Sequence, residues 1–172
     1  RQAEALLLAL VEEAPKVFTD PDNYDIRANL FWMATQALNG WLNVGTIQCW
    51  ATHNIGHELT ARLGIDHGQS LALVLPGVWR SLRKEKGDKI VQLGRRVFAI
   101  SETNFDKAID LTIEATKDFF KSLGINASKE EYGVTKEVIS SICRYIDQRG
   151  VKLGDRHNID GSKIANIFDL CD

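Results

Sequence analysis

Helical periodicity with very little proline constrains this sequence more than any other feature. Only three prolines occur, at positions 15, 21 and 76, so long stretches lack the residue that most often ends or kinks a helix. Between glycine, asparagine and aspartate residues, apolar side chains recur every three or four positions instead of alternating. No internal repeat or linker divides the chain. The pattern predicts a single all-α, multi-helix domain covering residues 1–172.

Eight helices are expected from these spacings. They cover residues 2–18, 24–40, 48–62, 67–84, 88–99, 104–123, 135–149 and 159–170. Gly64 follows the third at a place that favours a helix C-terminus, and Asp66 is a candidate N-cap for the fourth. Ile26, Leu30, Met33 and Ala37 form one apolar stripe of the second helix. Leu71, Val74, Leu75 and Val78 form the apolar face of the fourth, which Pro76 is expected to interrupt. Ser128 and Glu131 have capping-box spacing in the loop before residue 135.

Charge and cysteine content exclude several classes of protein. The 21 basic and 23 acidic residues give a net charge of −2 with no dense basic face, so nucleic acid is not an expected partner. No apolar run is long enough to cross a bilayer. Three cysteines without a Cys-x2-Cys spacing suggest neither a disulfide framework nor a zinc ribbon, and a reducing cytoplasm fits best. The chain begins inside a helical pattern, so we expect a piece of a longer protein.

Three of the four histidines fall close together, at positions 53, 57 and 67. His53 and His57 are four residues apart and therefore share one helix face. The sequence His-Glu-Leu-Thr-Ala from His57 begins like a zinc-protease helix, but Ala61 stands where that motif needs its second histidine. We therefore reject a protease interpretation of this segment.

A metal shared by His53 and His67 depends on where the third helix ends. On one unbroken helix the two residues would lie roughly 21 Å apart. If the helix stops before Gly64, the residues that follow can span about 17–20 Å back toward His53. A single histidine in an amphipathic helix is more often a core or surface residue, and that alternative stays open. A catalytic metal needs at least three protein ligands, and the other candidates are Glu58, Asp66 and His157.

Several stretches of the chain together resemble the iron-containing (group III) alcohol dehydrogenases, in their butanol dehydrogenase-like, NADPH-dependent aldehyde reductase branch. The stretches are "DNYDIRANLFWMATQALNG", "ATHNIGHELTARLGIDHGQSLALVLP" and "LGDRHNID", and the second contains His-x3-His followed by a further histidine ten residues on. The resemblance implies the all-helical, metal-binding C-terminal domain of the dehydroquinate synthase-like fold. It also implies an N-terminal α/β dinucleotide-binding domain that is absent from these 172 residues.

The same resemblance implies a role for each candidate residue. A divalent iron or zinc ion would take His53 and His67, together with an aspartate and a histidine from an Asp-x3-His helix that this chain lacks. His57 would lie beside the nicotinamide and the substrate and relay a proton; alternatively, it only orients its neighbours. Trp50 and His157 are candidates for the substrate pocket, although a core tryptophan and a surface histidine are the ordinary interpretations. Cys49 is expected to be a packing residue.

The function implied is metal-assisted hydride transfer between NADPH or NADH and short-chain aldehydes, carried out by a homodimer in the cytoplasm. The 172 residues alone are expected to be inactive and to bind metal weakly. The alternative is a helical interaction or metal-binding module without catalysis.

Overall fold

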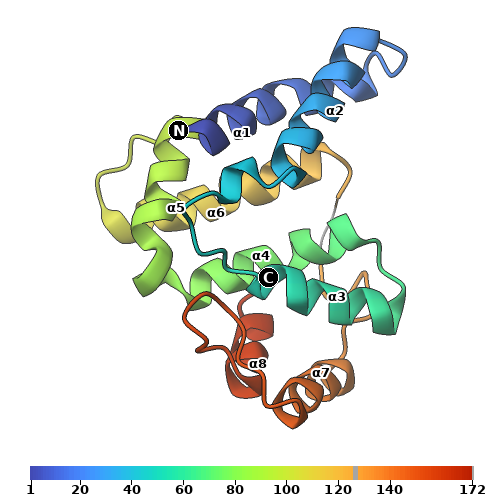
Figure 1. Cartoon of the computed structure of the whole chain (residues 1–172), viewed down its shortest axis with the longest axis vertical. Helices are drawn as coiled ribbons and strands as arrows, with labels where there is room; N and C mark the ends of the chain where they lie inside the picture. Colours follow the sequence, from blue (N-terminus) through green and yellow to red (C-terminus); the bar gives the residue numbers. More distant parts are fainter. Residues whose placement is uncertain (126–127, 172) are drawn as a thin grey trace. The chain divides into compact units, whose positions relative to one another are not determined.

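Helices make up most of the computed structural model, which describes residues 1–125 and 128–171 (Figure 1). The elements are α1 (Gln2–Glu13), η1 (Ala14–Phe18), α2 (Tyr24–Leu38), η2 (Trp41–Asn43), α3 (Ala51–Leu63), α4 (His67–Ser81), α5 (Arg83–Val97), α6 (Phe105–Ser122), α7 (Lys136–Gln148) and α8 (Gly161–Asp169). Within the described residues, one isolated bridge between Leu153 and Ile159 is the only β pairing. The predicted all-α class is confirmed.

Proline and glycine explain the main differences from the expected helix bounds. The first helix ends at Glu13 and continues as the 3-10 helix η1, in which Pro15 occupies one of the first two positions. Helix α5 begins at Arg83 and not at residue 88, because Gly87 lies inside it and does not break it. A Cβ on Gly87 would meet Phe105 at 2.8 Å, so its lack of a side chain serves packing.

Helix α4 is continuous through Pro76, as its expected range implied. The expected interruption of its apolar face is not found, because Pro76 is itself buried. Val74 and Val78 of its predicted apolar face are buried, whereas Leu71 and Leu75 are only half-buried. The buried residues of α4 cover more of its circumference than one stripe, because the helix packs against both α3 and α8. Pro76 itself is buried within this contact region.

The chain forms two compact units. The first comprises Arg1–Thr46 and Gly87–Leu123, and the second comprises Ile47–Lys86 and Gly124–Asp172. In the first unit the expected apolar stripe of α2 is only partly buried. Met33 lies in the core, but Ala37 is exposed. Large apolar side chains of this unit are instead exposed, namely Tyr24, Phe31, Trp32, Leu38 and Trp41.

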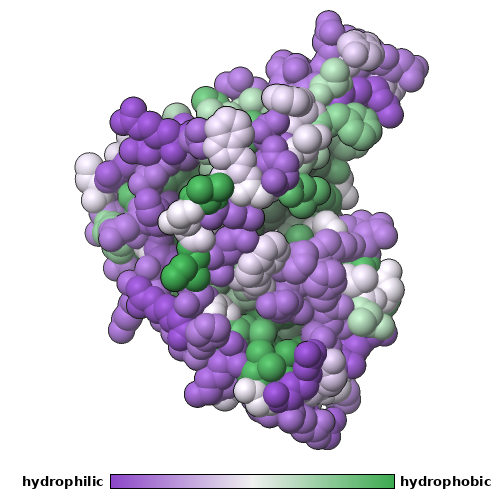
Figure 2. Space-filling view, viewed as in Figure 1, coloured by the Kyte–Doolittle hydropathy of each residue, from purple (hydrophilic) through white to green (hydrophobic). Residues whose placement is uncertain are grey.

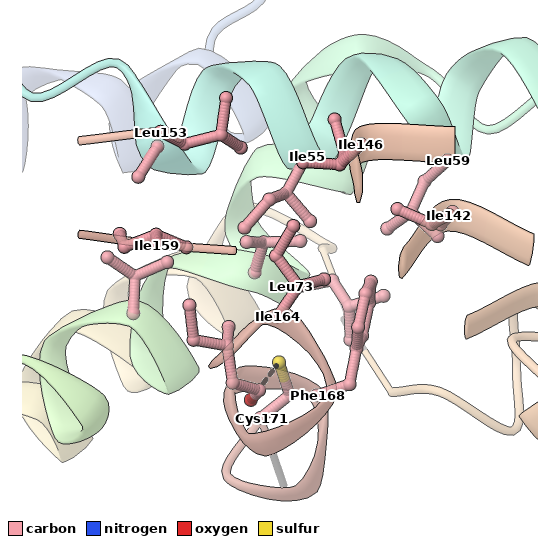
Figure 3. Close-up of a cluster of buried hydrophobic side chains, with 14 of the residues drawn as sticks. Ile55, Leu59, Leu73, Ile142, Ile146, Leu153, Ile159, Ile164, Phe168 and Cys171 are labelled. Atoms are coloured by element: carbon pink, nitrogen blue, oxygen red, sulfur yellow. Dashed lines mark hydrogen bonds between the residues drawn. The ribbon is translucent and has the colours of Figure 1, made fainter. Parts of the chain in front are cut away.

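The second unit has the larger apolar core, which α3, α4, α7 and α8 build together (Figure 3). Ile55, Leu73, Ile142 and Phe168 contribute one fully buried side chain from each of these helices. Most of the surface visible in Figure 2 is hydrophilic, with separate hydrophobic patches. Among the described residues, no helix has the length and apolar character that a membrane crossing requires.

One ion pair in the second unit couples stability to pH. Lys86 Nζ lies 2.7 Å from both carboxylate oxygens of Asp155, and both side chains are partly buried. The hydrogen bond from Lys86 lowers the pKa of Asp155, and burial opposes this shift. Because the folded-state pKa is depressed, the pair stabilises the fold above the ordinary pKa of aspartate, and this contribution is lost as pH falls through the folded-state pKa.

The substitution Asp155→Asn is expected to lower the free energy of unfolding at pH 7 by about 1 kcal/mol. It should also reduce the loss of stability that the unmodified chain shows on acidification. Urea unfolding at several pH values measures both effects. Asp118→Asn is the matched control. Asp118 is largely exposed, and its ion pair with Lys121 on the same helix is long, at 3.8 Å. An equal effect of both variants would contradict the role of the ion pair.

Candidate metal and catalytic site

The turn between α3 and α4 positions the histidine cluster. Helix α3 ends at Leu63, and Gly64 adopts a left-handed conformation with φ of +68° while its N–H donates to the Thr60 carbonyl. This is a conformation that glycine reaches without strain. Helix α4 then begins at His67. The prediction that the helix stops before Gly64 is therefore confirmed.

Asp66 occupies the expected N-cap position of α4, but its side chain makes no capping hydrogen bond. Its carbonyl instead accepts the N–H of Ser70 at 2.9 Å, the first bond of the helix. Ser70 also bonds through its hydroxyl to the His67 carbonyl at 2.8 Å and lies 3.2 Å from the Thr60 hydroxyl. These bonds fix the first turn of α4, and with it His67, against α3.

The three predicted imidazoles converge. His57 Nε2 lies 2.7 Å from His53 Nε2, and His67 Nε2 lies 3.3 Å from His53 Nδ1. The rings of His57 and His67 stack with centroids 4.5 Å apart, and both are nearly perpendicular to the ring of His53. One ligand nitrogen from each residue lies within 4.8 Å of the others.

The chemistry of this cluster suits a divalent cation. Burial lowers the pKa of His53, and the nearby His57 and His67 lower it further, since neighbouring imidazoles resist joint protonation. A neutral imidazole has a free lone pair, which iron and zinc accept as a ligand. His67 Nδ1 is buried and has no hydrogen-bond partner among the described residues. Buried ring nitrogens normally have a hydrogen-bond or metal partner.

The other ligand candidates do not join the cluster in the described residues. Glu58 forms an ion pair with Arg62 at 3.0 Å. His157 lies in the turn closed by the bridge between Leu153 and Ile159, with a φ of +49° and its Nδ1 3.3 Å from the Lys152 carbonyl. The three histidines therefore stand without a carboxylate ligand in the described part of the chain.

Cys49 and Trp50 directly precede α3, and Trp50 occupies its N-cap position. The Trp50 ring meets the His53 ring edge-on with centroids 5.0 Å apart, and the side chain is 49% exposed. This exposure argues against the interpretation of Trp50 as a core residue. Cys49 packs against the apolar core, as expected.

A cavity beside His57 was not foreseen from the sequence. It has a volume of about 280 Å³, and Asn54, His57 and Glu58 of α3 face Ile146, Arg149, Val151 and Leu153 across it. The second group follows His57 by many residues in the chain, so spacing and periodicity gave no signal for this contact.

Comparison with known proteins gives consistent matches along the whole chain. Residues 1–169 match the family described as "Fe-containing alcohol dehydrogenase family, C-terminal". The chain is 45% identical over 170 residues to the NADPH-dependent aldehyde reductase YqhD of Escherichia coli, covering 98% of this chain but 44% of that protein.

Solved structures agree with this similarity. The substrate- and cofactor-free form of the E. coli aldehyde reductase YqhD superposes with a TM-score of 0.93 at 41% identity, over 98% of this chain and 45% of that one. An NADH-dependent butanol dehydrogenase A from Thermotoga maritima gives a TM-score of 0.88 at 28% identity, over 98% and 44%. The chain thus spans less than half the length of the proteins it matches.

Proposed function

Because the chain belongs to the Fe-containing alcohol dehydrogenase family and matches its C-terminal part, we propose that it is the metal-binding and catalytic portion of an NAD(P)-dependent alcohol dehydrogenase. The reaction is the interconversion of short-chain aldehydes and alcohols. The convergence of three imidazoles where α3 meets α4 carries this proposal. The names of two similar proteins, an NADPH-dependent aldehyde reductase and an NADH-dependent butanol dehydrogenase, support it.

His53 and His67 are the proposed protein ligands of a divalent iron or zinc ion in this chain. Burial and the neighbouring imidazoles lower the pKa of His53, which favours its neutral, ligating form, and His67 Nε2 lies 3.3 Å from His53 Nδ1. We assign the remaining ligands to an Asp-x3-His segment of the full-length protein. When bound, the ion polarises the carbonyl of the aldehyde and stabilises the alkoxide.

His57 is the proposed proton-exchanging residue. Its side chain is exposed, unlike those of the two proposed ligands, while its Nε2 still lies 2.7 Å from His53. Imidazole has a reference pKa near 6.5 and exchanges protons readily near neutral pH. The His57 imidazole is therefore proposed to give a proton to the substrate oxygen during aldehyde reduction and to take one back in the reverse direction. The same ring is proposed to contact the nicotinamide.

Trp50 and His157 are proposed to border the substrate pocket. The exposed Trp50 ring, packed edge-on against His53, offers an apolar wall beside the proposed metal site. His157 is exposed in the turn that follows Leu153, whose side chain lines the cavity next to His57.

Exposed apolar side chains support a larger assembly. Tyr24, Phe31, Trp32 and Trp41 of the first unit are exposed, and exposed apolar patches commonly mark interaction surfaces. We propose that residues 1–172 form the all-helical C-terminal domain of a cytoplasmic, homodimeric enzyme. Its N-terminal α/β domain binds NADP(H) or NAD(H).

The test of this function uses the full-length protein with butanal and either NADPH or NADH. Turnover is expected, and chelation should lower it at least about tenfold because the carbonyl then lacks its Lewis acid. Adding back Fe²⁺ or Zn²⁺ separately should restore it and identify the ion. The isolated 172 residues should show no turnover. Full activity in protein proven free of metal would contradict the proposal, and absence of turnover with every short aldehyde would favour a non-catalytic helical interaction or metal-binding module.

A further inference from the structure

The cavity beside His57 has the features of a subsite for a small ligand. Its volume of about 280 Å³ lies near the lower end of ligand pockets. His57 forms part of its wall, so the cavity adjoins the group that we propose exchanges a proton with the substrate. A molecule that reacts next to His57 can therefore extend its unreactive end into this space.

The walls of the cavity combine apolar and polar groups. Ile146 and Leu153 are almost fully buried and belong to the same apolar cluster as Ile55 of α3 (Figure 3). Val151 on the same wall is 40% exposed and presents hydrocarbon surface that suits a short aliphatic chain. Asn54 adds an amide that both donates and accepts hydrogen bonds. This combination suits a short chain that ends in a polar group.

Glu58 and Arg149 are charged side chains of the cavity wall, and only Glu58 has a partner of opposite charge among the described residues. The carboxylate of Glu58 is neutralised by Arg62, whose Nη2 lies 3.0 Å from Glu58 Oε2. Arg149 has only a neutral partner. Its Nη1 donates to Tyr145 Oη at 3.1 Å, and its guanidinium lies 5.4 Å from the centre of the Tyr145 ring. Among the described residues, Arg149 has no carboxylate within ion-pair distance.

Tyr145 also holds the side chain of Arg149 in place before a ligand binds. Arg62 lies over the same ring at 5.5 Å, so this ring contacts two guanidinium groups. Stacking and the hydrogen bond together restrict Arg149, which reduces the side-chain entropy lost when it contacts a ligand. A guanidinium has the planar donor geometry that matches a carboxylate.

We infer that this cavity binds the unreactive end of the substrate and that Arg149 selects short aldehydes with a carboxylate at that end. The inference rests on the proposed dehydrogenase function and names a substrate class for it. The aliphatic chain contacts Val151 above the buried Ile146 and Leu153, and the carboxylate pairs with Arg149. Arg149 is a specificity-determining residue and takes no part in the hydride or proton transfer.

The test compares 4-oxobutanoate with butanal, which has the same number of carbons but no charge. In the full-length protein, kcat/KM should favour 4-oxobutanoate, and the preference should weaken as salt is added. Arg149→Gln should lower kcat/KM for 4-oxobutanoate about tenfold or more and change that for butanal less than about twofold. Arg149→Lys should give a kcat/KM for 4-oxobutanoate between those of the unmodified protein and Arg149→Gln. Lysine keeps the positive charge but lacks the paired N–H donors of the guanidinium.

Arg144→Gln is the matched control, since Arg144 is exposed on α7, whose C-cap is Arg149, and is not among the residues that line the cavity. Equal losses for both aldehydes in Arg149→Gln would indicate a structural role and overturn the inference, as would no loss for either. Butanoate binding, measured by calorimetry, gives a readout independent of turnover. If no aldehyde reacts but butanoate binds about tenfold more weakly to Arg149→Gln, the proposed function fails and the carboxylate subsite stands.

Discussion

Replacing both His53 and His67 with alanine is expected to remove the divalent ion from the full-length protein and to abolish its metal-dependent turnover. The two imidazoles lie 3.3 Å apart across the turn between α3 and α4, and each offers a nitrogen to the same space. Loss of groups that merely orient ligands costs 10- to 100-fold in metal affinity. Loss of two ligands should therefore cost at least about a hundredfold. Elemental analysis after dialysis measures the bound ion.

Two single variants sharpen this result. His157→Ala should keep its metal, because His157 lies outside the cluster in the described structure. His57→Ala should also keep its metal but lose about a hundredfold or more in turnover and change the pH profile, as expected for a proton-exchanging group. If His57 only orients His53, the same variant lowers metal affinity instead. Unchanged metal content in the His53 and His67 double variant would exclude the shared site.

The histidine cluster was predictable because every step that forms it is local. Gly64 ends α3, and His67 begins α4 three residues later, so chain geometry allows His67 to return to His53, as the family resemblance implied. The rest of the site depends on residues distant in the sequence. Arg149 and Leu153 reach the cavity beside His57 only because α7 and the turn after it pack near α3. No spacing rule contains that information.

Apolar patterns and breaker residues were less reliable guides, because their effect depends on tertiary contacts. The apolar stripe of α2 predicted a core face, yet Ala37 is exposed and large aromatic side chains such as Trp32 are exposed too. Gly87 was expected before a helix and lies within one. Phe105 and Ile109 occupy the space that a side chain on Gly87 would need. The role of a glycine within a helix can therefore be assigned only when the side chains that pack against it are known.

Gly77 of α4 provides a strong test of that principle. A Cβ at this position would collide with the carbonyl oxygen of Ile167 and lie 2.7 Å from Cys171 Sγ. The Ile167 oxygen belongs to the backbone of α8 and cannot rotate away, so α8 would have to shift. Cys171 would also be displaced from its 3.2 Å contact with the same carbonyl. Gly77→Ala is expected to lower the free energy of unfolding by about 2 kcal/mol or more, despite better helix propensity.

The matched control is Gly68→Ala in the same helix, where no atom lies within 4 Å of the added carbon. There the gain in helix propensity should act alone and raise the free energy of unfolding by up to about 1 kcal/mol. Urea unfolding of the 172-residue chain followed by circular dichroism compares the two variants. If Gly77→Ala were as stable as Gly68→Ala, α4 and α8 would have to lie further apart than the structure places them. A large difference of the expected sign would show that Gly77 is required for close packing and not for a turn.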